Sequence, residues 1–186
     1  VHEIRFGDRV ASQRHALRST TQDTDRIKPV ESVAGASFST FQILKATVAN
    51  LHVVDRPFEW NYSLEAPDYA KAAGELLLVR PRVLGSESSG LLETKEARRY
   101  PVEFEGPERD TDVFDIELPA GYQLDELPPP IDLDDGFASY RSKTEIVGRT
   151  LRYSRTFEIK NLSVPVSDTV KLRDFYRVIA DDERNS

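Results

Sequence analysis

The chain has 186 residues, of which 39% are hydrophobic and 31% charged, and its net charge is −7 at pH 7. This composition is typical of a globular domain that can bury a hydrophobic core. The negative charge argues against general nucleic-acid binding, and no apolar run approaches the roughly 20 residues that cross a bilayer. The absence of cysteine excludes disulfides, thiolate metal sites and a cysteine nucleophile within these residues.

The N-terminal segment, residues 1–37, predicts a strand followed by helices. "VHEIRF" alternates apolar and charged residues as a strand does, and it lacks an initial methionine, so we expect a segment of a longer protein. "GDRVASQRHALRS" favours a helix capped by Asp8, and its weakly apolar stripe indicates a peripheral position. A second short helix is expected near Pro29, ending before Gly35.

From Phe38 the pattern changes to strands. "PFEWNYSLE" alternates most clearly, with Trp60 and Tyr62 on one face. This regularity indicates a core in which Trp60 needs a partner for its indole N–H, and the alternative is an exposed platform that stacks on sugars. "APDYAKAAGE" predicts a turn or short helical connection. Further strands are expected in "LLLVRPRVL", in "YPVEFE" with Tyr100, Val102 and Phe104 inward, in "DVFDIELP", and in "FASYRSKTEIVGRTLRYSRTFEIK", which turns near Gly148.

The C-terminal stretch, residues 167–183, predicts an amphipathic helix that lies against a sheet. Its apolar residues recur with helical spacing, and Ser167 or Asp168 is the expected cap. The predicted fold class is therefore mainly β: an antiparallel β-sandwich with peripheral N-terminal helices and a C-terminal amphipathic helix. We expect residues 1–37 to join an upstream core to a sandwich module, residues 38–186, in which the loop 85–97 is a possible internal boundary. The helix stripe consists of Leu172, Phe175, Tyr176 and Ile179.

Charge is unevenly distributed along the second half of the chain. Residues 103–135 hold twelve acids and one base, whereas residues 141–160 hold six bases and two acids. We expect these segments to complement each other across a sheet, and the alternative is a cationic partner for the acidic segment. Within "LRYSRTFEI", Arg155 falls on the apolar face, so we predict that it is partly buried and paired with a carboxylate or backbone carbonyls. A ligand-binding role for Arg155 is the alternative.

Motifs that carry chemistry are not evident. The three histidines are isolated, no Gly-x-Ser-x-Gly turn presents a nucleophile, and no glycine-rich phosphate loop occurs. "IDLDDG" fails the spacing of a calcium loop because Phe137 stands where glycine is needed and Lys143 where a bidentate glutamate is needed. We therefore predict no catalytic residue, no metal site and no cofactor.

Three stretches carry a resemblance to a known family. They are "NLHVVDRPFEWNYSLEAPDYAKAAGELLLVRPRVLG", "RRYPVEFEGPERDTDVFDIELPAGYQLDELPPP" and "YRSKTEIVGRTLRYSRTFEIKNLSVPVSDTVKLRDFYRVIADDE". In order and spacing they resemble the region after the catalytic core of bacterial transglutaminase-like proteins that begin with a domain of unknown function. The resemblance implies a non-catalytic β-rich accessory domain, often in proteins exported to the cell envelope, with a periplasmic or extracellular location. The Cys/His/Asp machinery of that family lies in the core, so no catalytic residue is carried over to this chain.

The leading functional hypothesis is thus a scaffold or partner-binding domain whose partners are upstream domains of the same polypeptide, or a protein or polysaccharide. The first alternative is a carbohydrate- or peptide-binding module, for which Trp60 and Tyr62 are the candidate residues. The second alternative is a hydrolase that uses a pair of carboxylates.

Overall fold

The computed structural model describes residues 1–7, 9–18, 23–67, 69–87 and 98–185. These residues form two compact units, Val1–Val79 and Arg80–Ser186. The first unit contains the predicted helical segment 1–37 together with the first strands that follow it. Two predicted features, the cap Asp8 and most of the boundary loop 85–97, lie outside the described residues, and the predicted domain limits stay predictions.

The first unit is built on an antiparallel sheet in the order β1-β3-β2, formed by β1 (His2–Arg5), β2 (Gln42–Ala49) and β3 (Phe58–Glu65). The alternation in β3 sends Phe58, Trp60 and Tyr62 into the core, as predicted. Phe58 and Trp60 make an edge-to-face contact with ring centroids 5.6 Å apart. One face of β3 is therefore buried and the other is polar.

Two helices connect β1 to β2, namely α1 (Arg9–Arg18) and α2 (Asp23–Ser37). The prediction that the second helix is short and ends before Gly35 is wrong, because α2 runs through Pro29 and Gly35 to Ser37. A proline inside a helix costs about 3 kcal/mol. The complete burial of Val30 and Ala34 on the following turns offsets this cost, since the apolar side chains leave water only if the helix continues.

A small hairpin ends the first unit. Its strands are β4 (Lys71–Ala73) and β5 (Leu76–Leu78), which pair antiparallel. The predicted turn or helical connection over residues 66–75 is thus wrong for its second half. Gly74 adopts a φ of 66°, and a glycine with positive φ allows the tight turn that a hairpin needs.

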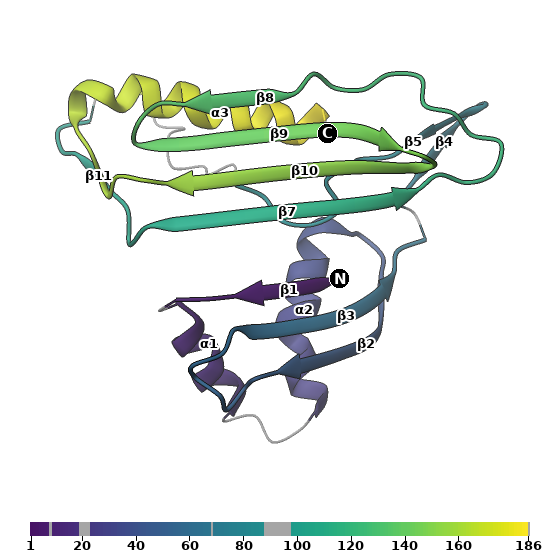
Figure 1. The fold of residues 1–186 in the computed structure, drawn as a ribbon, viewed down its shortest axis with the longest axis horizontal. Helices are drawn as coiled ribbons and strands as arrows, with labels where there is room; N and C mark the ends of the chain where they lie inside the picture. Colours follow the sequence, from purple (N-terminus) through teal and green to yellow (C-terminus); the bar gives the residue numbers. More distant parts are fainter. Residues whose placement is uncertain (8, 19–22, 68, 88–97, 186) are drawn as a thin grey trace. The chain divides into compact units, whose positions relative to one another are not determined.

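The second unit is built on a four-stranded antiparallel sheet in the order β7-β10-β9-β8 (Figure 1). The strands are β7 (Glu108–Glu117), β8 (Ile131–Asp134), β9 (Ala138–Val147) and β10 (Thr150–Ile159). β9 and β10 turn at Gly148, as predicted, with Thr150 opposite Val147. β8 forms an edge strand directly after the prolines, and the sequence did not predict it.

Helix α3 (Thr169–Asn185) covers the buried face of this sheet, and the chain enters it through a 3-10 turn, Val166–Asp168. The predicted cap residues, Ser167 and Asp168, are part of that turn, where the Ser167 hydroxyl donates to the Asp168 carboxylate at 3.3 Å. Phe175 illustrates the packing, since its ring lies 5.6 Å from the ring of Phe137. All four predicted stripe residues are buried in one cluster with side chains of β9 and β10. A two-residue pair, β6 (Val102–Glu103) with β11 (Ser163–Val164), closes one end of that cluster.

The predicted mainly β fold, with antiparallel sheets and a C-terminal amphipathic helix, is confirmed. One inward residue was wrong: Tyr100 is 78% exposed, because pairing starts only at Val102 and leaves Tyr100 outside the sheet. None of the helices in the described part of the chain combines the length and apolar character that a membrane crossing requires.

Replacing Ile179, which is fully buried, by alanine tests the role of α3. We expect the free energy of unfolding to fall by about 2–5 kcal/mol, because the deletion removes buried methyl groups and leaves a cavity. Urea denaturation followed by far-UV circular dichroism measures the change. Val170→Ala, on the exposed side of the same helix, is the matched control and should stay within about 0.5 kcal/mol of the unmodified chain. Equal losses for both variants would contradict the proposed packing.

Candidate functional site

Arg155 lies on β10 with its side chain on the face that α3 covers. The alternation of this strand buries Tyr153, Arg155 and Phe157 together. Register places Arg155 opposite Asp112 of β7 on one side and Ser142 of β9 on the other. The guanidinium is therefore in the apolar layer of the unit, and the side chain is only 2% exposed.

Three carboxylates surround this guanidinium. Nε donates to Oδ2 of Asp112 at 2.9 Å, and Nη2 donates to the same oxygen. Nη1 donates to Oε1 of Glu183 at 2.9 Å, and Nη2 lies 3.5 Å from Oε1 of Glu87. We call these four residues the Arg155 cluster. The predicted carboxylate pairing of Arg155 is confirmed, its burial is more complete than the partial burial predicted, and its role stays a prediction.

Glu183 connects the cluster to the segment before residue 88. Its Oε2 accepts a hydrogen bond from the Ser86 hydroxyl at 2.6 Å, and its Oε1 accepts one from the backbone N–H of Glu87 at 2.6 Å. The segment approaches closely at Gly85, which has a φ of 77° and where an added Cβ would lie 3.3 Å from Nη2 of Arg155. The cluster thus joins the sheet, the end of α3 and the segment Arg82–Glu87.

A second buried polar contact lies next to the first along α3. Tyr140 of β9 donates a hydrogen bond to Oδ2 of Asp182 at 2.6 Å, and Tyr153 lies 3.4 Å from the same oxygen. Burial, reinforced by the bond to Asp182, raises the pKa of Tyr140 well above its usual range. The phenol therefore stays protonated and keeps donating to the carboxylate.

The electrostatics of the cluster are uneven, because three acids share one guanidinium. Burial would lower the pKa of Arg155, but Asp112 and Glu87 outweigh that effect and raise it above its ordinary value. Burial raises the pKa of Glu87 to about 7; Arg155 opposes this shift, and Asp110, Asp112 and Glu108 add to it.

The other candidate residues, Trp60 and Tyr62, lie in the first unit. The Tyr62 hydroxyl donates to Oε1 of Glu3 at 2.6 Å, and the Arg5 guanidinium lies 5.4 Å from the centre of the Trp60 ring. The expected partner for the Trp60 indole N–H is absent among the described residues. Trp60 is only 2% exposed and therefore offers no surface on which a sugar could stack. Its ring is held by the edge-to-face contact with Phe58 and by the guanidinium of Arg5.

The solvent face of the second unit pairs its charges across strands. Arg152 donates bidentately to Asp115 at 2.7 and 2.8 Å, and Arg141 donates to Asp132 at 2.8 Å. Lys160 donates to Asp134 at 2.6 Å. The predicted complementarity of the acidic and basic segments is therefore confirmed. Within the described ranges, no group of three His, Cys, Asp or Glu side chains is arranged to hold a metal ion.

Sequence reasoning found Arg155 but missed its partners. Asp182 and Glu183 stand three and four residues after Ile179, so they continue the apolar stripe of α3. Acids at that spacing are a signal for buried carboxylates. Glu87 had no such signal, since its position depends on how the chain approaches Gly85.

Residues 75–186 match the model of a family described as Domain of Unknown Function with solved-structure structure (DUF3858). The chain belongs to this family. The DUF3858 match covers every residue of the Arg155 cluster and the Tyr140–Asp182 contact, whereas Trp60 and Tyr62 precede it. Searches among curated proteins and among solved structures found no match.

Replacing Arg155 by alanine leaves three carboxyls converging on a site without a counter-charge. We expect the free energy of unfolding to fall by about 3–5 kcal/mol, as for other broken buried ion pairs. Urea denaturation measures the change. The matched control is Arg152→Ala, which removes an arginine and its carboxylate pair from the exposed face of the same strand. It should change stability little, and a similar small effect of Arg155→Ala would show that the cluster does not stabilise the unit.

The raised pKa of Glu87 predicts a pH dependence with a definite sign. The folded chain keeps the proton up to about pH 7, whereas an unfolded glutamate loses it near 4.5, so the folded state binds more protons in that interval. The stability contributed by this group is complete below pH 4.5 and falls as the pH rises to about 7. Denaturation at several pH values should show this decline in the unmodified chain and a flatter profile in Glu87→Gln. Glu117→Gln, which removes an exposed carboxyl from the end of β7, should keep the unmodified profile.

Proposed function

We propose that this chain is a non-catalytic accessory domain that acts as a scaffold in a transglutaminase-like protein. The observation that supports the proposal is that the polar atoms of the Arg155 cluster are occupied by contacts within the unit. The side chains of Arg155 and Glu183 are 2% and 4% exposed, and their polar atoms fasten three segments of the unit to one another. Side chains held in such contacts are not free to meet a substrate, and removing one of them leaves the others buried without a counter-charge.

The resemblance to the region behind a transglutaminase-like core supports the parent assignment, and membership in DUF3858 is compatible with an accessory role. A thiol nucleophile would have to come from another domain, because this chain has no cysteine. The partners we propose are therefore upstream domains of the same polypeptide. A bacterial envelope location, periplasmic or extracellular, follows from the same resemblance and belongs to this proposal.

The two alternatives have less support. A sugar-binding module needs an exposed aromatic platform, and Trp60 and Tyr62 are buried in their unit. A carboxylate-pair hydrolase needs two acids that flank a substrate. Asp112 and Glu183 converge on the guanidinium of Arg155, so the acids neutralise a cation instead of facing an open site.

The test compares the chain alone with the chain joined to a transglutaminase-like core. The chain alone should incorporate no fluorescent amine into a glutamine-containing peptide and should release no ammonia from it. Arg155→Ala in the joined polypeptide should lower the thermal stability of the core or its turnover per folded molecule, whereas Arg152→Ala should not. Turnover by the chain alone would contradict the non-catalytic assignment. A core that is indifferent to loss of the second unit would contradict the scaffold role.

A further inference from the structure

The first unit carries a cleft of about 270 Å³ that the family match does not cover. It lies where β1 leads into α1, beside the loop that precedes β3. Its floor is formed by the buried side chains of Val10 and Arg14, and Gly7 lines it with open space where a Cβ would stand. The remaining walls come from Arg5, Phe6, Ala11 and residues 54–57.

Arg14 holds the loop side of the cleft in place. Its guanidinium donates to the carbonyls of Val53 at 2.7 Å and Arg56 at 2.5 Å, and also to the carbonyl of Asn50. Asn50 adopts a φ of 59° and donates to the carbonyl of Pro57 at 2.9 Å. Three backbone carbonyls fixed by one buried cation make a loop that is ordered before any ligand arrives, which reduces the entropic cost of binding.

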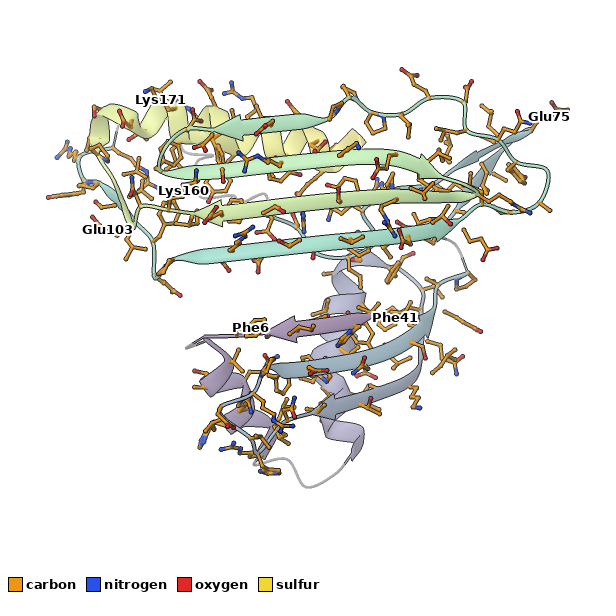
Figure 2. All side chains as sticks on the ribbon, viewed as in Figure 1. Phe6, Phe41, Glu75, Glu103, Lys160 and Lys171 are labelled. Carbon is orange, nitrogen blue, oxygen red and sulfur yellow. The ribbon has the colours of Figure 1, made fainter. Side chains whose placement is uncertain are left out.

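Two large apolar side chains stand in water at the mouth of the cleft. Val54 is 75% exposed on the loop, and Phe6 is 72% exposed. Figure 2 shows Phe6 just past the end of β1. Exposed apolar residues in a flexible tail need no special explanation. Phe6 and Val54, however, both line a cavity. Apolar groups that rim a preformed hollow are typical of a recognition surface.

Among the described residues that line the cleft, the charged side chains are three arginines, Arg5, Arg14 and Arg56, and one acid, Asp55. The guanidinium of Arg14 in the floor of the cleft donates to backbone carbonyls and not to a carboxylate, so its positive charge is not neutralised. Arg5 is neutralised by Glu3, to which its Nε donates at 3.0 Å. Arg56 and Asp55 stand exposed on the rim, and none of the described residues offers the Arg56 guanidinium a partner. Among the described residues that line the cleft, Arg14 and Arg56 have no carboxylate partner, and Asp55 is the acid that opposes them.

We propose that this cleft is a docking site for an acidic peptide segment that inserts one large apolar side chain. The cavity volume suits a single side chain and is smaller than a typical pocket for a drug-sized ligand. β1 is an edge strand of its sheet, and its last residue, Arg5, lines the cleft. An extended segment lying along β1 would thus deliver a side chain between Phe6 and Val54, and its carboxylates would meet Arg56.

The experiment titrates the complete chain with the peptide acetyl-Glu-Asp-Phe-Glu-Asp-amide and follows backbone amide shifts by NMR. We expect shift changes confined to residues 5–14 and 50–57, with a dissociation constant of about 1 mM or tighter. Two comparison peptides should bind more weakly: one with lysine and arginine in place of the acids, and one with alanine in place of phenylalanine. Equal binding of all three peptides, or shift changes elsewhere, would overturn the proposal.

Variants of the rim separate the charge contribution from general effects. Arg56→Glu should weaken binding about tenfold and Asp55→Asn should strengthen it, because each changes the field at one exposed rim position. Lys45→Glu makes the same charge change on β2 outside the cleft and should leave binding unchanged. Identical weakening by Arg56→Glu and Lys45→Glu would show that only net charge matters and would overturn the site. The scaffold role of the second unit does not depend on this result.

Discussion

The packing of the second unit depends on one buried cation, the guanidinium of Arg155. Burying a guanidinium to 2% exposure in an apolar layer is costly unless hydrogen-bond acceptors reach it, and for Arg155 these are carboxylates. Those carboxylates come from β7, from the segment before residue 88 and from the end of α3. The ion pairs of Arg155 therefore fix which segments of the chain meet at this point. Apolar contacts alone would specify these partners less strictly. The dependence is mutual, because the Glu183 side chain is only 4% exposed and also needs a partner for its charge.

The first unit also contains a buried arginine, but its chemistry differs. Arg14 binds the carbonyls of Asn50, Val53 and Arg56 where Arg155 binds carboxylates. Carbonyl dipoles stabilise a guanidinium without cancelling its charge. In the second unit the cluster has more acids than bases, and burial raises the pKa of Glu87 to about 7. In the first unit the same side-chain type leaves a net positive floor beneath an open cleft, and this difference is why the two arginines lead to different proposals.

Sequence patterns predicted the features that depend on alternation along one segment. They gave the β9–β10 hairpin, the buried stripe of α3 and the need of Arg155 for a partner. They failed where tertiary contacts decide the outcome. α2 continues through Pro29 because Val30 and Ala34 are buried, and β8 forms because β9 offers an edge with Tyr140 opposite Leu133. Periodicity tells which way a side chain faces, but the identity of its partner depends on which distant segment arrives there.

A purely apolar layer of the same volume could be as stable as one that contains an ion cluster, since desolvation offsets much of the Coulomb attraction. The register of the sheet offers a reason for the arginine. A slip of β7 by one residue would place Thr111 or Val113 opposite Arg155 instead of Asp112. The guanidinium would then lose both hydrogen bonds to Asp112 while remaining buried. The free-energy cost of an unpaired buried charge is far larger than that of a displaced methyl group. We infer that the cluster favours one register of β7 over its neighbours and so contributes to the specificity of the fold.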